Sequence, residues 1–338
     1  MAAVVFGPIL SVITMWFLTR EQAQTASAVL FVLTGVSGVL ACGYGIVAME
    51  PFFLPTNLFF TMVATFDKFS ALFFFPFALL VTALGMRWYA QRAVAPRTHA
   101  QVIGTALIVI GTTWVVLSTN ILGIVAALFV ILCGEACLAS HTTRIVVLRS
   151  VGVIAVAIGL FILSSGALFN DFAALAYIAA EINPPRLIGA FAAVLIGVTA
   201  LSGGWPFTRT MSRQTSVMLA GAERALVRST YVVVPLYVCI RAVLFILPPL
   251  TLWFAVPVSV IGVLTMLSAT HFASKHRAYS DTTFVFGVGV TLFMLSSAMS
   301  FQALAMFEAM NVVLFATLLH IAGIVLSGGA EEYVPNTG

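Results

Sequence analysis

The chain has very few charged side chains. Only 8% of its 338 residues are Asp, Glu, Lys or Arg, whereas about 25% are charged in an average soluble domain. So few charges cannot cover the surface that a soluble protein of this length exposes to water. The hydrophobic content of 62% and the mean hydropathy of +1.13 agree with this reading. The composition therefore excludes a soluble globule and indicates an integral membrane protein.

Short catalytic motifs are also missing. The sequence contains no Walker loop, no HExxH and no GxSxG, and it has no long polar stretch in which a separate catalytic domain could fold. We predict no catalytic site of its own, and leave open whether the chain belongs to an oxidoreductase complex. The four cysteines lie in apolar runs without a histidine at ligand spacing, so we predict neither a metal site nor a cofactor.

Lysine is nearly absent. The chain has only Lys68 and Lys275, and neither lies in the middle of an apolar run. No lysine therefore lies in the middle of a predicted span.

Long apolar runs fill most of the remaining sequence. A bilayer-spanning helix needs roughly 20 mostly apolar residues, and only helices satisfy the backbone of such runs in lipid. The sequence predicts an all-α, polytopic transmembrane helical bundle of about eleven spans in a single integral membrane domain, residues 1–338, with a polar tail at 328–338. The predicted spans are 4–19, 27–48, 69–90, 102–118, 120–140, 145–164, 187–204, 217–240, 243–270, 281–300 and 302–327.

Charges between the spans alternate along the chain. Basic connections hold Arg87, Arg92, Arg97, then Arg144 and Arg149, then Arg209 and Arg213, then Lys275 and Arg277. The connection at 164–186 carries instead the acidic Asp171 and Glu181. By the positive-inside rule the basic connections face the cytoplasm or its equivalent. The net charge of +4 is thereby explained by topology, and we predict no nucleic-acid partner.

A few ionisable residues fall inside the apolar runs, where they are costly and become functional candidates. Glu135, late in the span 120–140, is either a proton-carrying carboxylate or a residue near enough to the interface to reach water or His141. Glu223, Arg224 and Arg228 begin the span 217–240, and they form either an internal ion-paired relay or an interfacial anchor.

The last span adds a polar group of its own. Glu308, Asn311 and His320 lie along 302–327, where His320 is either a packing residue or a proton shuttle. Lys275 completes the candidate set, in a basic turn before the span 281–300.

Seven segments, taken in order, resemble one family: the antiporter-like subunits of respiratory complex I and of multisubunit cation/proton antiporters, nearest the L-type (chain 5) branch. The run FDKFSALFFFPFALLVTALGMRWYAQ resembles the family's Asp-x-Leu-Ser segment, and GVTALSGGWPFTRTM resembles its Gly-Lys-Ser-Ala-Gln-x-Pro stretch. The other five are STNILGIVAALFVIL, TRIVVLRSVGVIAVAIGLFILSSGALFNDFAAL, PLYVCIR, SKHRAYSDTTFVFGVGVTLF and NVVLFATLLHIAG.

This resemblance implies an antiporter-like inverted-repeat fold. It divides the chain into N-terminal spans at 1–100, a first repeat at 101–241 and a partial second repeat at 242–327. The chain ends about where the family's next broken helix would begin, so the second repeat is expected to be incomplete.

In the family, protons are thought to move along a row of buried lysines, histidines and a glutamate. Carried over by position, the lysine of the seventh span falls on Leu201, and the histidine and lysine of the eleventh fall on Asn311 and Phe315. The histidine of the eighth span falls near Val227. The glutamate of the fifth falls on Phe129, unless a short insertion makes Glu135 its replacement. The row is therefore expected to be lost, because leucine and phenylalanine do not titrate.

Three functional hypotheses remain open. The chain is a membrane subunit of a complex I-like (NADH-quinone oxidoreductase chain 5-like) ion-translocating assembly, degenerate or accessory; or the L-type membrane subunit of a two-component inorganic-carbon uptake complex; or a structural membrane scaffold. The expected partners are the lipid bilayer and other membrane subunits. The expected location is the bacterial inner membrane, or the mitochondrial inner membrane.

Overall fold

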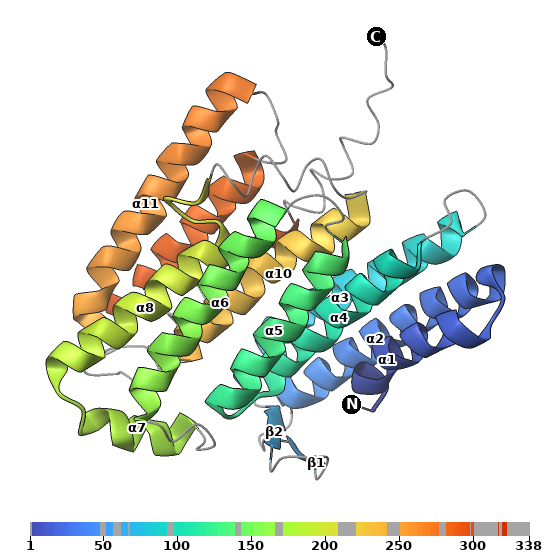
Figure 1. The fold of residues 1–338 in the computed structure, drawn as a ribbon, viewed down its shortest axis with the longest axis horizontal. Coiled ribbons are helices and arrows are strands. Elements are labelled where there is room, and N and C mark those ends of the chain that lie inside the picture. The colour runs from blue at the N-terminus through green and yellow to red at the C-terminus, as the bar shows by residue number, and fades with distance from the viewer. Residues whose placement is uncertain are drawn as a thin grey trace. The chain divides into compact units, whose positions relative to one another are not determined.

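The chain forms two compact helical units (Figure 1). Unit 1 holds Met1–Thr119 and Ala126–Thr142, and unit 2 holds Asn120–Val125 and Thr143–Gly338. The computed structural model describes residues 2–47, 52–56, 62–66, 68–92, 98–138, 143–165, 172–208, 221–241, 251–276, 282–297, 299–300, 317 and 320–322.

Unit 1 is a group of helices with one small hairpin. Its elements are α1 (Ala2–Phe17), α2 (Arg20–Val47), β1 (Phe52–Thr56), β2 (Met62–Phe66), α3 (Lys68–Gln91), α4 (His99–Leu117) and most of α5 (Ile121–Leu138). Helix α2 packs against both α1 and α3. The strands β1 and β2 pair antiparallel, with Phe52 opposite Phe66.

Unit 2 is formed by helices alone among its described residues. They are α6 (Thr143–Ser164), α7 (Phe172–Ala180), α8 (Pro184–Ser202), α10 (Gly221–Ile240), α11 (Thr251–His276) and the helix Thr282–Ser297. Helix α8 packs against α6 and α10, and Figure 1 shows α6 and α8 side by side.

Seven helices in the described part of the chain are long and apolar enough to cross a membrane: α2, α3, α4, α5, α6, α8 and α11. Phe6–Phe17 and Thr282–Ser297 are shorter apolar helices. Helix α10 has the length to span, but its first half carries Glu223, Arg224 and Arg228. The predicted all-α membrane bundle is confirmed.

Local sequence explains where several helices begin and end. Thr98 caps α4 through a reciprocal pair of hydrogen bonds, in which Gln101 N–H donates to the Thr98 hydroxyl and Thr98 N–H donates to the Gln101 side chain. Pro184 and Pro185 start α8, where the missing N–H of proline costs nothing. Gly203 ends α8 at a φ of 71°, a conformation that favours glycine.

Small residues allow α6 and α8 to approach closely. A Cβ atom added to Gly197 of α8 would lie 2.7 Å from the carbonyl oxygen of Gly152 and 2.5 Å from Val156 Cγ2, both on α6. Glycine on both sides of an interface lets two backbones meet, which is how helices pack where lipid gives no hydrophobic driving force. The contact therefore holds α6 and α8 close together at Gly152 and Gly197.

Several predicted element boundaries were wrong. The region 49–67 contains the β1–β2 hairpin, and the acidic connection contains α7, neither of which was predicted. Helix α2 begins at Arg20, not at residue 27. Helix α11 is described from Thr251 onward, and the first part of the predicted span 243–270 lies outside the described residues. Most of the last predicted span, 302–327, lies outside the described residues.

Candidate functional site

Helix α10 is the centre of unit 2. Every residue from Ala225 to Ile240, and Arg241 after it, is buried. A helix buried on all sides is normally apolar throughout, yet Glu223 and Arg228 of α10 are each only 1% exposed. The charged first half of α10 is therefore inside the unit.

Arg228 lies beside an aromatic and histidine cluster. Its guanidinium carbon is 5.4 Å from the ring centroid of Phe284, on the helix Thr282–Ser297, and the Phe284 ring is 5.9 Å from that of His320. The His320 ring is buried and rests on the backbone of Gly287, where an added Cβ would overlap His320 Cδ2. Gly287 thus makes the room that His320 occupies.

A second arginine reaches the same centre from α6. Arg149 is 2% exposed, and its Nη1 donates a hydrogen bond to the carbonyl oxygen of Leu201 near the end of α8. Its guanidinium carbon lies 3.8 Å from the ring centroid of Tyr231 on α10. Tyr231 in turn lies 6.3 Å from Phe284. The two arginines are therefore linked through neighbouring aromatic rings.

The end of α10 holds a third buried arginine. Arg241 Nε donates to the Tyr237 hydroxyl at 3.0 Å, and its guanidinium lies 6.0 Å from the ring of Phe172 on α7. Arginine suits such positions because its weakly hydrated, planar group stacks on aromatic rings. Among the described residues of unit 2, the buried Arg, Lys, Asp and Glu side chains are thus three arginines and one glutamate, Glu223.

The remaining predicted site residues are spread over the chain. Glu135 of α5 lies in unit 1 and is 4% exposed. Phe129, on which the family's glutamate is expected to fall unless a short insertion makes Glu135 its replacement, is 47% exposed. Arg224 is half-buried on α10. Lys275 lies in the last turn of α11, and its side chain is outside the described set, as are Glu308, Asn311 and Phe315 entirely.

Of the predicted set, the structure brings together Arg228 and His320, which both lie near the Phe284 ring in unit 2. Glu223 is buried on the same helix as Arg228, five residues earlier. The structure also adds residues that the sequence analysis did not select: Arg149, Tyr231, Arg241 and Phe284. Arg149 was assigned to a basic connection, which is wrong, because it lies well inside α6. Its place within the apolar run 145–164 was the signal that could have identified it.

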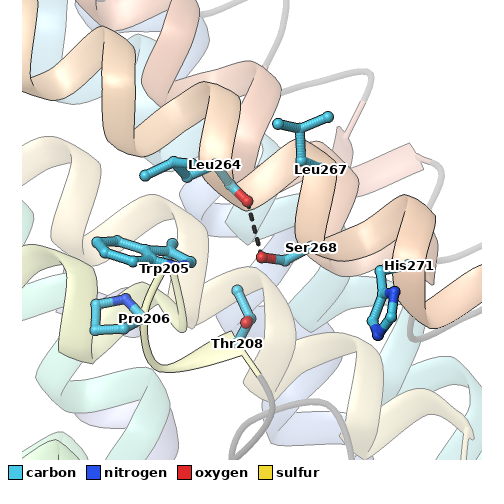
Figure 2. Close-up of a pocket in the computed structure, with 7 residues that line it drawn as sticks. All are labelled: Trp205, Pro206, Thr208, Leu264, Leu267, Ser268 and His271. Atoms are coloured by element: carbon cyan, nitrogen blue, oxygen red, sulfur yellow. Dashed lines mark hydrogen bonds between the residues drawn. The ribbon is translucent and has the colours of Figure 1, made fainter.

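Unit 2 also contains a pocket that none of these charged side chains lines. It measures about 440 Å³ and is lined by Trp205, Pro206, Thr208, Leu264, Leu267, Ser268 and His271. Figure 2 shows the segment after α8 facing α11 across it, with the Ser268 hydroxyl donating to the Leu264 carbonyl. The backbone N–H of Trp205 donates a hydrogen bond to Thr265 Oγ1 at 2.9 Å, which connects that segment to α11. None of the predicted site residues lines this pocket.

The described residues offer no group of three His, Cys, Asp or Glu side chains that could hold a metal ion. What the centre of unit 2 can do chemically follows from its guanidinium groups. Held on aromatic rings and a carbonyl oxygen, they place positive charge inside an apolar bundle.

No protein-family model and no curated protein sequence matches this chain. Solved structures do match its fold. A chain of the membrane-bound sulfane sulfur reductase, an archaeal respiratory membrane complex, superposes with a TM-score of 0.76 at 13% identity, over 96% of this chain and 56% of that one.

Two further matches are similar. A chain of the Mrp complex from Dietzia sp. DQ12-45-1b gives a TM-score of 0.70 at 16% identity, over 97% of this chain and 64% of that one. A chain of respiratory complex I from Thermus thermophilus, solved with bound NADH, gives 0.72 at 14% identity, over 98% and 72%. This chain spans less than two thirds of the first two. It therefore shares the antiporter-like membrane fold of these chains, and at such identities the likeness extends to the fold alone.

Proposed function

We propose that this chain is a membrane subunit of a multi-subunit assembly built on the antiporter-like fold, nearest the L-type branch, and that it does not carry protons by the family's central route. The fold match to chains of respiratory and Mrp complexes supports the first part. The bacterial inner membrane is the location that we propose for it.

The observation that carries the second part is the position of Leu201. This residue stands where the resemblance places the key lysine, and it is 1% exposed, with its Cγ atom 3.0 Å from the point that a Cβ on Gly152 of α6 would occupy. An isobutyl side chain packed in this way has no proton to exchange. Val227, near the place of the histidine, is also apolar and buried, so an ion would meet a high barrier at both positions.

Purification from native membranes tests the assembly. The tagged full chain, extracted in mild detergent, should bring with it other membrane proteins in stoichiometric amounts, identified by mass spectrometry. Quinone-oxidoreductase subunits would support the proposal as stated, whereas a zinc-binding carbonic-anhydrase-like partner would replace it with the inorganic-carbon hypothesis. A stable, monodisperse monomer would contradict it.

Reconstitution into vesicles with a pH-sensitive dye tests transport. The isolated chain should show no proton flux, and an ionophore added at the end provides the control that the vesicles hold a gradient. The buried carboxyl groups of Glu135 and Glu223 are the alternative carriers. Flux that disappears in both Glu135→Gln and Glu223→Gln would show that a relay exists elsewhere, and the proposal would be wrong.

A further inference from the structure

Three helices of unit 2 meet at the Arg149 side chain. Arg149 comes from α6, its Nη1 donates to the carbonyl of Leu201 on α8, and its guanidinium carbon lies 3.8 Å from the Tyr231 ring centroid on α10. With 2% exposure the group is fully inside the protein. A cation held from three sides in this way is a built feature of the fold.

The side chain at position 201 extends toward the same part of α6. Leu201 packs on Gly152, which follows Arg149 by three residues, so the two share one helical turn. A lysine at 201 would therefore bring its ammonium group to the turn of α6 that already carries Arg149. Two buried cations at one place repel each other strongly in a low dielectric.

We infer that Arg149 supplies from α6 the buried positive charge that a lysine at position 201 would supply from α8, and that it makes this charge permanent. A guanidinium cannot be deprotonated in a protein, whereas a lysine amine can release its proton when buried. The site keeps a cation and loses the ability to exchange a proton.

The consequence for ion passage rests on the function proposed above. A fixed arginine in a narrow path excludes protons and other cations, as it does in selective pores. Arg228, beside Phe284, adds a second buried positive charge on α10. Arg149 thus places a charge that cannot be removed by deprotonation inside unit 2, which also holds the buried Glu223.

A double-substitution experiment tests whether the two positions share one charge site. The full chain is purified with its native partners, and its thermal midpoint in detergent is measured for Leu201→Lys, Arg149→Gln and the double variant. Gln at 149 is polar and neutral, and its side chain ends two bonds short of the arginine Nη1, so it removes the charge together with the hydrogen bond to the Leu201 carbonyl. Leu201→Lys should lower the midpoint by about 3 °C or more beyond its effect in the Arg149→Gln background. Equal shifts in the two backgrounds would overturn the inference.

Matched variants separate charge from size. Leu201→Met, long and neutral, should have the same effect in both backgrounds, and Val194→Lys, buried on α8 about 10 Å away along the helix, should not depend on residue 149. Leu201→Lys should remain costly when Arg149→Lys keeps the charge. If Arg149→Gln alone does not fold, adding Leu201→Lys should recover folded protein, and failure to do so would contradict the inference. These measurements do not depend on which partners are found, so their outcome is independent of the proposed assembly.

Discussion

The buried arginines of unit 2 share one kind of surrounding. Arg149 lies on Tyr231, Arg228 beside Phe284, and Arg241 against Tyr237. A desolvated guanidinium over an aromatic face gains about 2 kcal/mol or more, which offsets part of the cost of burying the charge. A lysine ammonium is more strongly hydrated and fits such a site less well. This explains why arginine can occupy the interior of a chain with so little lysine.

Gly287 offers a test of how tightly His320 is held. A methyl group at 287 would overlap both Cδ2 and Nε2 of the His320 ring, so Gly287→Ala must displace the ring. We expect a loss of about 1–3 kcal/mol of stability, typical of an overpacked interior. The thermal midpoint of the purified protein measures it.

The same substitution in a His320→Ala background provides the control. With the ring removed, Gly287→Ala should cost clearly less, because nothing remains for the methyl group to meet at that place. Equal costs in the presence and absence of the imidazole would mean that the ring does not occupy this position.

The sequence could identify ionisable residues in apolar runs but not their neighbours. Glu223 and Arg228 stood out because charges are rare in such segments. Tyr231 and Phe284 did not, because aromatic residues are common in membrane helices, and their role depends on which helices meet. Arg149 was misassigned because the limits of a span are read less reliably than its existence.

At the scale of helices, the α6–α8 contact depends on the absence of a side chain at Gly197. An added Cβ would lie 2.7 Å from the Gly152 carbonyl oxygen, and also 2.7 Å from the Val156 backbone nitrogen. Backbone atoms cannot move aside as a flexible side chain can. Gly197→Ala should therefore destabilise the protein by about 1–3 kcal/mol, measured as a fall in thermal midpoint.

Gly189, earlier on α8, is the matched control. A Cβ there meets nothing within 4 Å, and alanine is favoured over glycine in a helix by up to about 1 kcal/mol. Gly189→Ala should leave the midpoint unchanged or raise it. If both substitutions behave alike, the close approach of α6 and α8 is wrong.

Long apolar segments could be predicted from the sequence, while short elements could not. A membrane span requires about 20 apolar residues. This run of apolar residues is visible in the sequence however the helices pack. Helix α7 has 9 residues, too few to be distinguished from a connection. The strand Phe52–Thr56 contains Pro55, which lowers the expectation of a strand. Both elements depend on tertiary contacts, which the local sequence pattern does not predict.

For the whole molecule, the fold persists at 13–16% identity to its structural relatives. The resemblance was visible in the sequence as the order and spacing of segments. It did not depend on the titratable residues, since we expect two of them to fall on Leu201 and Val227. Spacing of apolar runs and small residues at helix contacts maintain such a bundle, whereas function depends on a few side chains, so the fold can be kept while the chemistry changes.

The sidedness of the chain in the membrane gives a further prediction for the whole molecule. Between Arg92 and Glu181 lie three helices long and apolar enough to span, α4, α5 and α6, and three crossings place the two residues on opposite sides. Helix α7, with 9 residues, covers only about 14 Å and cannot return the chain across roughly 30 Å of hydrocarbon. The positive-inside rule assigns Arg92 to the cytoplasmic side.

Cysteine labelling tests this sidedness. In a variant whose four cysteines are replaced, Arg92→Cys and Glu181→Cys, both at exposed positions, should react with an impermeant maleimide from opposite faces of sealed vesicles. Arg186→Cys, exposed in the first turn of α8, should be labelled from the same face as Glu181→Cys and so controls for access. Labelling of positions 92 and 181 from one face would mean that one of the three helices does not cross.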